Sequence, residues 1–264
     1  MLYDFLVRFV LKIWGLATLV ISFIIIGNTF RLLLIWNESL MRKASARLLQ
    51  WASKIAIWIL GIKIKRPDDS LVNWNSLPQF GLIVSNHLSY LDVVVISSSV
   101  KCIFITSEEI RESGFLGWIT LGGGSYFVER RNAHRLKQEL RELTALLKAG
   151  HRIAIFPEAT SSDGRAILNF KRALFKIGEM ARVPVLPICI NYSKLDGTVM
   201  DRERADRFFY YRDMSFIENI IYVLKRREIE VELRLFEPIE SGDSEASLHE
   251  RCFEQVSNFY RPIL

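Results

Sequence analysis

Eighteen consecutive residues near the N-terminus, from Ile13 to Phe30, carry no charged side chain. A helix that crosses a bilayer needs about twenty apolar residues, so this run is borderline for a full span. A cleaved secretory signal would have a shorter apolar core and a small-residue cleavage site, whereas here Arg31 and a further apolar stretch follow. The run therefore predicts a retained hydrophobic helix, which either spans the bilayer once or dips into one leaflet.

The next segment, from Glu38 to Ile62, has the periodicity of an amphipathic helix. Its apolar residues recur at three- and four-residue steps, and lysines and arginines fill much of the rest. The apolar set consists of Leu48, Trp51, Ala52, Ile55, Trp58, Ile59 and Ile62. Cationic residues beside tryptophans are typical of a helix in a lipid head-group layer, although the pattern also suits a helix that packs on a folded domain. Together the two segments predict a membrane anchor over residues 1–61.

The charge of the chain is unevenly distributed. The formal net charge is +6, but residues 1–66 hold ten Lys/Arg and two Asp/Glu, a net of +8, and the remaining residues sum to −2. The N-terminal basic residues lie among tryptophans on apolar helices and not on a polar face with aromatic platforms, so nucleic acid is not an expected partner. The charge favours an anionic lipid bilayer as the partner. Basic residues flank the first apolar run on both sides and set no crossing direction.

From residue 62 the pattern changes to short apolar runs that alternate with helical periodicity. This alternation predicts an α/β domain over residues 62–264, with a mostly parallel central sheet flanked by helices. The run Glu228–Phe236 alternates charged and apolar residues and predicts an edge strand. The other expected strands are Ile62–Lys65, Gly81–Ser85, Cys102–Ile105, Ser125–Val128, Ile153–Phe156 and Val185–Ile190. The expected helices of the domain are Ala133–Lys148, Phe170–Ala181 and Ser244–Tyr260.

An apolar strand leads directly into the sequence NHLSYLD, which begins at Asn86. On one continuous helix, residues five apart lie about 140° from each other, so His87 and Asp92 could not meet there. They can meet if His87 lies in the turn after the strand and Asp92 lies in the next helix. A carboxylate on one imidazole nitrogen fixes the tautomer and leaves the other nitrogen free as a general base. The spacing alone also suits a helix-capping Asp beside an unrelated His.

This block resembles the NHxxxxD motif of the glycerolipid acyltransferases, of the lysophosphatidic acid (1-acylglycerol-3-phosphate) acyltransferase type. Three further blocks are similar to motifs of that family and follow in the same order. Residues 124–130, GSYFVER, resemble the second motif. Residues 156–161, FPEATS, resemble the third, FPEGTRS, and residues 183–187, VPVLP, resemble the fourth. The resemblance covers roughly residues 62–240, and the ordered succession of four motifs makes it specific.

The resemblance implies an acyltransferase that moves a fatty acyl group from a thioester to the free hydroxyl of a lysolipid. His87 would be the general base and Asp92 would orient it, without an acyl-enzyme. Neither a cofactor nor a metal is implied, because coenzyme A or acyl carrier protein delivers the acyl group as a co-substrate. Among the acceptor-binding residues, Arg130 can contact a phosphate through two nitrogens. The residues that the resemblance places around the acceptor are Asn86, Gly124, Phe127, Arg130, Glu158 and Thr160.

Two positions depart from the third motif of the family. Ala159 stands where the family has Gly, so a left-handed backbone there would cost free energy. Ser161 stands where the family has a phosphate-binding Arg, and Arg165, Lys171 or Arg172 would have to supply that charge. The first expectation for the acceptor is 1-acylglycerol-3-phosphate, which would give phosphatidic acid. The stretch SSDG at residues 161–164 is similar to the lyso-ornithine lipid acyltransferases, so lyso-ornithine lipid or another lysophospholipid is the alternative acceptor.

Other functional classes have less support in the sequence. The three cysteines are far apart and form no CxxC, and the four histidines lack metal-ligand spacing, so neither a disulfide framework nor a metal site is expected. A serine hydrolase is disfavoured because no GxSxG elbow is present. The departures in the third motif leave open a non-catalytic protein that only binds lipid at a membrane surface. Because acyl thioesters are made in the cytosol, we expect the catalytic domain on the cytoplasmic side of the membrane.

Overall fold

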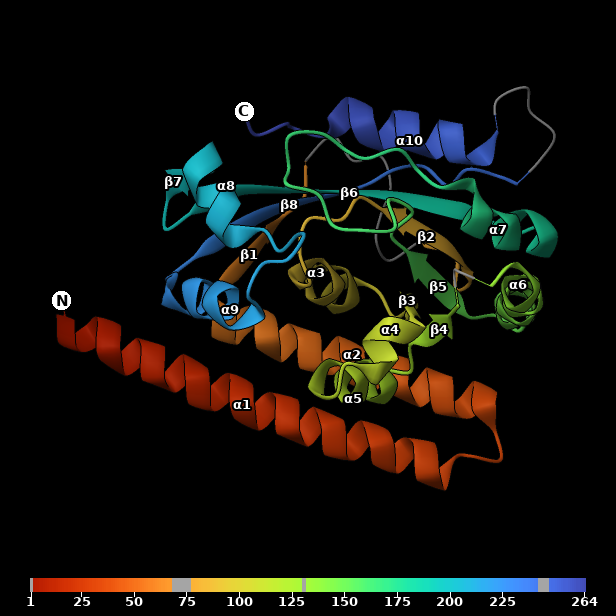
Figure 1. The fold of residues 1–264 in the computed structure, drawn as a ribbon, viewed down its shortest axis with the longest axis horizontal. Coiled ribbons are helices and arrows are strands. Elements are labelled where there is room, and N and C mark those ends of the chain that lie inside the picture. The colour runs from red at the N-terminus through yellow and green to blue at the C-terminus, as the bar shows by residue number, and fades with distance from the viewer. Residues whose placement is uncertain (1, 68–76, 130–131, 242–246) are drawn as a thin grey trace.

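The computed structural model describes residues 2–67, 77–129, 132–241 and 247–264. Its strands form one sheet in the order β1-β8-β6-β2-β5-β3-β4, and the short β7 pairs with β6 (Figure 1). The strands are β1 (Ile62–Lys65), β2 (Gly81–Ser85), β3 (Ile103–Ser107), β4 (Tyr126–Val128), β5 (Arg152–Ile155), β6 (Val185–Leu195), β7 (Thr198–Val199) and β8 (Ile229–Leu235). The helices are α1 (Leu2–Leu33), α2 (Glu38–Leu60), α3 (Leu91–Ser99), α4 (Glu108–Glu112), α5 (Phe115–Gly122), α6 (Ala133–Lys148), the 3-10 helix η2 (Arg172–Phe175), α7 (Lys176–Ala181), α8 (Arg202–Phe208), α9 (Phe216–Lys225) and α10 (Leu248–Phe259).

The sheet is mostly parallel, as the sequence predicts. β2 pairs in parallel with β5 and β6, and β3 pairs in parallel with β5 and β4. Among the described strands, β7 and β8 run antiparallel to β6. All five residues of β2 are buried, which explains the apolar run Leu82–Val84. The carboxyl end of β2 therefore lies in the middle of one edge of the sheet, where α/β proteins commonly place their sites.

The expectation of an edge strand at Glu228–Phe236 is wrong. β8 lies between β1 and β6, so β1 stands at that end of the sheet. The odd-numbered residues of β8 are buried, and Glu230 on the other face forms ion pairs with Lys65 of β1 (3.5 Å) and Lys194 of β6 (3.6 Å). The alternation of charged and apolar residues reflects one partly exposed face of the sheet, and it carries no information about the order of the strands.

The other expected strands and helices form, with two differences in extent. β6 continues to Leu195, beyond the apolar run that predicted it, because its second half pairs with β8. The helix expected over Phe170–Ala181 forms in two parts, since η2 covers Arg172–Phe175 and α7 begins at Lys176.

Helices cover both faces of the sheet. α10 lies along one face, and α3, α2 and α1 form successive layers on the other (Figure 1). α2 begins after Asn37, whose side chain accepts a hydrogen bond from Leu40 N, and ends at Gly61 in the left-handed conformation. Small side chains let α2 lie close to the body, and its buried residues include Ser45, Ala46, Ser53 and Ala56.

α1 runs antiparallel to α2 and is fixed to the body near both of its ends (Figure 1). Lys12 Nζ donates to the backbone carbonyls of Leu60 (2.6 Å) and Arg226 (2.8 Å). Towards the other end, Gly27 packs against Gly122 of α5 so closely that a Cβ on Gly27 would lie 2.5 Å from the Gly122 carbonyl oxygen. α1 therefore lies along the α/β body and does not extend away from it.

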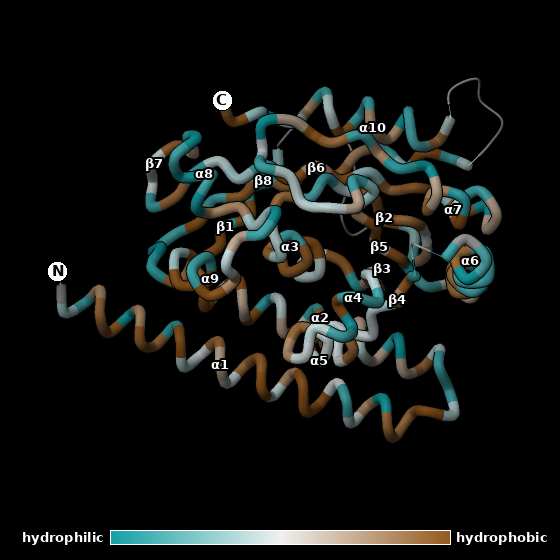
Figure 2. The backbone as a smooth tube through the Cα atoms, viewed as in Figure 1, coloured by the Kyte–Doolittle hydropathy of each residue, from teal (hydrophilic) through white to brown (hydrophobic). Residues whose placement is uncertain are grey.

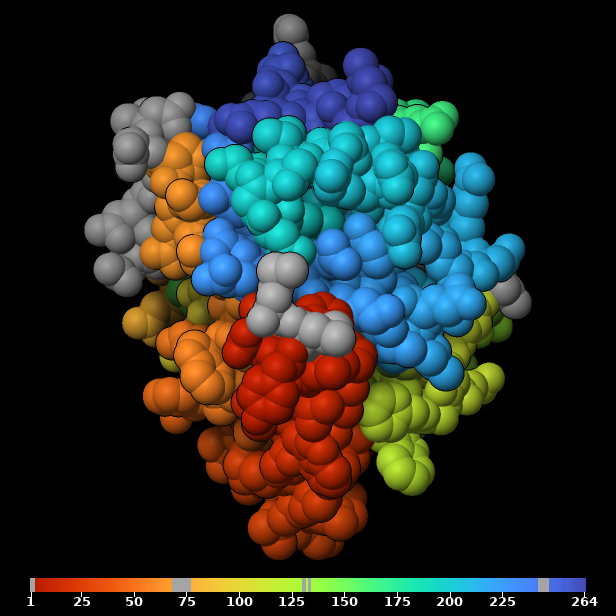
Figure 3. Space-filling model, turned by 90° about the vertical axis from the view of Figure 1, so that its left-hand side faces the viewer, coloured from red at the N-terminus to blue at the C-terminus, as the bar shows by residue number. Residues whose placement is uncertain are grey.

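α1 is apolar along most of its length (Figure 2), whereas the exposed residues of α2 are partly apolar and partly charged. The segment Tyr3–Leu33 of α1 is long and apolar enough to cross a membrane, and only 11% of its most apolar window is buried. Viewed from the left-hand side, α1 and α2 protrude together from the rounded α/β body (Figure 3). Such a large exposed apolar surface marks contact with a membrane or a partner. Its exposed tryptophans are Trp14, Trp36, Trp51 and Trp58, and Trp118 is exposed on α5.

Candidate active site

His87 and Asp92 meet at the carboxyl end of β2. β2 ends at Ser85, His87 lies in the loop that follows, and Asp92 lies in the first turn of α3. The His87 Nδ1 atom lies 2.9 Å from Asp92 Oδ2, and the Asp92 side chain is fully buried. The predicted strand–turn–helix contact is therefore confirmed. Asp92 also accepts hydrogen bonds from Leu88 N (2.6 Å) and Ser89 N (2.9 Å), so the loop wraps around this carboxylate.

Tyr192 adds a donor to Asp92 that the sequence patterns did not reveal. Its hydroxyl donates to Asp92 Oδ1 at 2.9 Å from the neighbouring strand β6. Burial, together with the nearby Asp92 charge, raises the pKa of Tyr192 well above its usual value, so the phenol stays protonated and donates. Tyr192 follows the fourth sequence block by five residues. Only the pairing of β6 with β2 brings it to the carboxylate.

The His87 ring is held on one face by an aromatic stack. The ring of Phe156, at the start of the third block, lies 4.0 Å from the imidazole centroid and is inclined by 12°. Phe104 of β3 stacks in turn on Phe156, with centroids 5.9 Å apart. The His87 side chain is 21% exposed, and within the described residues no hydrogen bond occupies its Nε2. Nε2 is therefore free to accept a proton.

Glu158 connects the third block to the His87 loop. It is 2% exposed, and its two oxygens accept hydrogen bonds from His87 N (2.7 Å) and Leu168 N (2.8 Å). Burial raises the pKa of Glu158 to about 8, although these two backbone donors act in the opposite direction. The carboxyl group therefore supports the His87 backbone, and a direct contact between Glu158 and an acceptor stays a prediction.

The other predicted acceptor residues have different surroundings. Asn86 is buried, and its side chain bonds Ile190 N (2.8 Å) and the Ile190 carbonyl (3.0 Å), which joins β2 to β6. Thr160 is exposed on the loop after β5. Phe127 of β4 lies under the guanidinium group of Arg111, 5.6 Å from its ring centroid. The structure thus brings Asn86 and Glu158 to the His87 loop as supporting residues.

Gly124 is required by the packing of α2. It has a φ of 72°, and a Cβ at this position would lie 2.7 Å from Ser45 Cβ. The Gly124 carbonyl also accepts a hydrogen bond from Arg42 Nη1 at 3.0 Å. A side chain here would push α2 away from β4, so packing alone explains why this residue is a glycine. Arg130 of the same block lies outside the described residues, and its contact with an acceptor stays a prediction.

The two departures from the third motif have clear structural consequences. Ala159 has a φ of 65°, the left-handed conformation that a glycine adopts freely, at a cost of about 1–2 kcal/mol for a residue with a Cβ. Ser161 Oγ donates to the Tyr210 carbonyl at 2.5 Å. The Ser162 N–H donates to the His87 carbonyl at 2.9 Å. These bonds hold the loop after β5 against the His87 loop and the segment before α9.

The geometry defines a general-base site on an α/β domain. A buried carboxylate holds the imidazole through Nδ1, and the remaining nitrogen can take a proton from a hydroxyl that a substrate brings. Within the described residues, no three His, Cys, Asp or Glu side chains gather into a possible metal site. Residues 73–191 match the family model Acyltransferase.

Several curated relatives of the chain are named acyltransferases. The chain is 32% identical over 165 residues to a lyso-ornithine lipid O-acyltransferase of Brucella abortus, covering 60% of this chain and 62% of the relative. It is 27% identical to the lyso-ornithine lipid O-acyltransferase of Rhodobacter capsulatus, covering 72% and 66%. A 1-acyl-sn-glycerol-3-phosphate acyltransferase of Neisseria gonorrhoeae is 29% identical, with half of each chain covered. The chain thus spans less than two thirds of the length of these relatives.

The same fold occurs in the crystal structure of the 1-acyl-sn-glycerophosphate (LPA) acyltransferase PlsC from Thermotoga maritima. The TM-score is 0.62 at 21% sequence identity, and the alignment covers 97% of this chain and 94% of that one. At this identity the likeness concerns the fold, including the mostly parallel sheet and the flanking helices.

Proposed function

We propose that the chain is an acyltransferase that moves a fatty acyl group from an acyl thioester to the free hydroxyl of a lysolipid. The observation that carries this proposal is the His87–Asp92 pair at the carboxyl end of the central strand, inside a segment that matches the Acyltransferase family model. The names of the relatives support the reaction type, since they are O-acyltransferases of lyso-ornithine lipid and of 1-acylglycerol-3-phosphate.

In the proposed mechanism His87 is the general base. Its Nε2 removes the proton from the acceptor hydroxyl as that oxygen attacks the thioester carbonyl carbon. The tetrahedral intermediate then collapses, the carbon–sulfur bond breaks, and the thiolate takes the proton back from the imidazolium. Asp92 stabilises the imidazolium and keeps Nδ1 as the donor. The substrate supplies the nucleophile, so the thioester of coenzyme A or acyl carrier protein reacts without an acyl-enzyme.

We favour lyso-ornithine lipid as the acceptor. The hydroxyl of Ser161, which stands in the place of a phosphate-binding Arg, is bonded to the Tyr210 carbonyl. Arg165, one of the cations that could replace that charge, pairs instead with Asp163 at 3.6 Å. An ornithine head group has no phosphate, so it requires no such cation. The relatives from Brucella abortus and Rhodobacter capsulatus support the same acceptor by their names.

The second candidate acceptor is 1-acylglycerol-3-phosphate, which the second block and the Neisseria relative favour. The residue that separates the two candidates is Arg130, which can bind a phosphate. If the acceptor carries a phosphate, Arg130→Ala should raise the acceptor KM strongly. If the acceptor is lyso-ornithine lipid, the same change should affect KM much less. Measuring KM for both lipids with the wild type and with Arg130→Ala decides between them.

We also propose that α1 and α2 hold the enzyme on a membrane surface without a full crossing. The hydrogen bonds of Lys12 and the Gly27–Gly122 contact support this arrangement, because they hold α1 lengthwise on the body. The exposed tryptophans and apolar residues on the outer side would then enter one leaflet. The N-terminal net charge of +8 favours anionic lipid, and the supply of acyl thioesters favours the cytoplasmic leaflet.

The experiment that tests the function incubates purified protein with acyl-coenzyme A or acyl carrier protein and a panel of lysolipids. Formation of a two-chain lipid from one of the lysolipids is the expected result. Unchanged lysolipid with every donor would instead support the non-catalytic lipid-binding protein that the sequence leaves open.

A further inference from the structure

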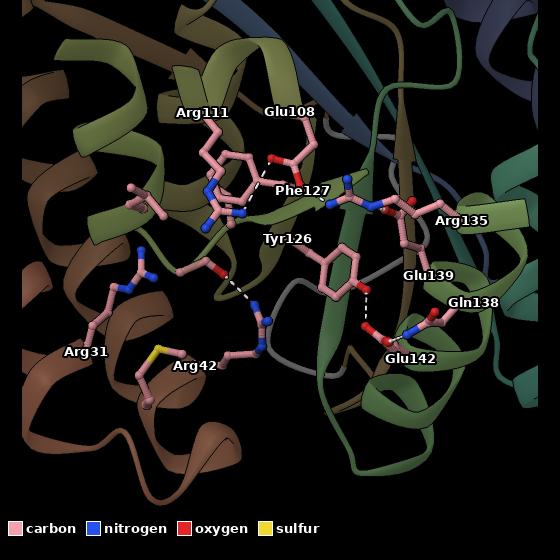
Figure 4. A pocket seen from close by; sticks show the side chains of 14 residues that line it. Arg31, Arg42, Glu108, Arg111, Tyr126, Phe127, Arg135, Gln138, Glu139 and Glu142 are labelled. Carbon is pink, nitrogen blue, oxygen red and sulfur yellow. Dashed lines mark hydrogen bonds and ion pairs between the residues drawn. The ribbon is translucent and has the colours of Figure 1, made fainter. Parts of the chain in front are cut away.

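A polar pocket lies between the N-terminal helices and the β4 edge of the sheet (Figure 4). Its volume is about 330 Å³, and residues of α1, α2, α4, α5, β4 and α6 line it. Gly124 and Phe127, which the resemblance places around the acceptor, are among the lining residues. They belong to the β4 edge of the sheet, and β4 is separated from β2 by β3 and β5, so β4 stands about 14 Å from the strand that leads to His87, at the usual strand spacing. The pocket is therefore a different place from the general-base site.

Three arginines line the side of the pocket formed by α1, α2 and α4. Arg42 is 9% exposed and is fixed, because it donates to Gly124 O and forms an ion pair with Glu38 at 2.7 Å. Arg31 of α1 and Arg111 of α4 approach the pocket from other directions (Figure 4). Three like charges around one cavity repel one another, unless an anion lies between them.

Two of these arginines lack a good anionic partner. Across the described chain, no hydrogen bond or ion pair involves the side chain of Arg31. Arg111 stacks on Phe127 and forms only a long bond to Glu108 Oε2 (3.5 Å), while Arg135 holds the other oxygen of Glu108 at 2.6 Å. The guanidinium groups of Arg31 and Arg111 are therefore available to a ligand.

The carboxylates on the α6 side of the pocket are already occupied. Glu139 accepts from Glu129 N and pairs with Arg135 at 3.2 Å. Glu142 accepts from the Tyr126 hydroxyl at 2.5 Å and from Gln138 at 2.9 Å. These bonds hold both carboxylates on the α6 wall, where Glu142 also interacts electrostatically with Arg42. Among the described residues, neither carboxylate forms an ion pair with Arg31 or Arg111.

The mouth of the pocket borders apolar surface. The residues that follow Arg31 are largely exposed, and Trp36 at the tip of the α1–α2 turn is 93% exposed. On α5, Leu121 lines the pocket and Trp118, one turn earlier, is 61% exposed. A ligand that joins an anionic group to hydrocarbon chains fits this boundary better than a free inorganic ion.

We propose that this pocket binds the oxyanion, a phosphate or a carboxylate, of a membrane-lipid head group. Arg31 and Arg111 are its direct ligands, and Arg42 is a fixed charge behind them. Planar guanidinium groups suit this role because each can offer two parallel N–H donors to an oxyanion. The site would fix the α1–α2 end of the protein on the lipid surface. This inference does not depend on acyl transfer.

The test measures binding by calorimetric titration with two soluble probes, dihexanoyl phosphatidylglycerol below its micelle concentration and inorganic phosphate. The wild type should bind the lipid clearly more tightly than phosphate. Arg31→Gln/Arg111→Gln should lose roughly ten-fold or more in lipid affinity, because two charge-assisted hydrogen bonds are lost. Its melting temperature without ligand should equal or exceed that of the wild type, because a repulsion is removed.

The matched control is Lys43→Gln/Arg47→Gln, which removes the same charge from exposed positions on α2 outside the pocket lining. It should bind the lipid like the wild type. If the control loses as much affinity as the pocket variant, bulk charge explains the binding and the site is refuted. Equal affinity for inorganic phosphate and lipid would refute the lipid head group.

If Arg31→Gln/Arg111→Gln does not fold, Arg31→Lys/Arg111→Lys decides, since it should fold and bind the lipid more weakly. The binding measurement needs no catalytic turnover, so a failure to bind the lipid can be distinguished from a failure of acyl transfer.

Discussion

At the scale of single residues, Asp92 is the centre of the candidate site. Its Oδ2 accepts from His87 Nδ1 and from Leu88 N and Ser89 N, and its Oδ1 accepts from the Tyr192 hydroxyl. Three donors from the loop after β2 and one from β6 fix the carboxylate in one orientation. A base whose partner is held in this way has a fixed tautomer and a fixed direction for its free nitrogen.

The Tyr192 hydroxyl is expected to act on catalysis by positioning Asp92. Tyr192→Phe leaves the buried Oδ1 without its donor, which costs about 1–3 kcal/mol. We expect kcat to fall by about ten-fold while the acceptor KM stays the same. Tyr260→Phe is the control, because its hydroxyl bonds the Gly164 carbonyl at 2.8 Å away from Asp92. If both variants lower kcat equally, Tyr192 has only a structural role.

Glu158 should make the stability of the fold depend on pH. Its pKa is raised from 4.5 to about 8. Between these pH values the folded state binds a proton that the unfolded state has lost. The stabilisation is complete below about pH 4.5 and is lost as the pH rises through about 8. The free energy of unfolding should therefore fall with pH more steeply in the wild type than in Glu158→Gln. Chemical denaturation across this range measures both slopes.

The control for this comparison is Glu203→Gln on α8, an exposed position. It should keep the slope of the wild type. Equal slopes for the wild type and Glu158→Gln would contradict the assignment of a protonated, buried carboxyl group.

At the scale of secondary-structure elements, the local part of the site was predictable and the long-range part was not. The sequence predicted the strand, the turn and the helix that join His87 to Asp92, because these residues lie within one short segment. The sequence does not reveal the role of Tyr192, because this role depends on β6 lying beside β2, and no local pattern encodes the strand order. The wrong edge position for β8 has the same cause.

Asn86, Gly124 and Glu158 show a second limit of sequence patterns. The resemblance placed these residues around the acceptor, but the motifs do not say what each side chain contacts. In the structure Asn86 joins two strands, Gly124 admits α2, and Glu158 holds the His87 backbone. Sequence patterns mark positions with strict requirements, and only the packed structure distinguishes a scaffold requirement from a ligand contact.

The contact between α1 and α5 yields a test at the same scale. A Cβ on Gly27 would meet the backbone of Gly122 at 2.5 Å, whereas a Cβ on Gly15 would meet only the side chain of Ile59 at 3.4 Å. Gly27→Ala should therefore lower the free energy of unfolding by about 1–3 kcal/mol, the usual cost of overpacking. Gly15→Ala should be neutral or slightly stabilising, because Ala favours a helix. Thermal unfolding in detergent compares them, and equal melting temperatures would show that α1 does not dock on α5.

At the scale of the whole molecule, charge and hydrophobicity separate into two parts with different tasks. Residues 1–66, which include α1 and α2, carry a net charge of +8 and most of the exposed tryptophans, while residues 67–264 have a net charge of −2. Bulk attraction to anionic lipid therefore belongs to α1 and α2. The body must recognise its substrates through a few placed groups around the carboxyl end of β2. This division is consistent with an enzyme that takes its acceptor from the membrane and its donor from solution.

The most direct test of the central claim is the rate of acyl transfer by wild type, His87→Ala and His134→Ala with one acyl thioester and the lysolipid panel. His134 lies exposed at the start of α6 and serves as the matched control. The account predicts that His87→Ala loses about a hundred- to ten-thousand-fold in rate, the usual contribution of a general base, while His134→Ala transfers like the wild type. Acyl transfer by His87→Ala at the wild-type rate would contradict it.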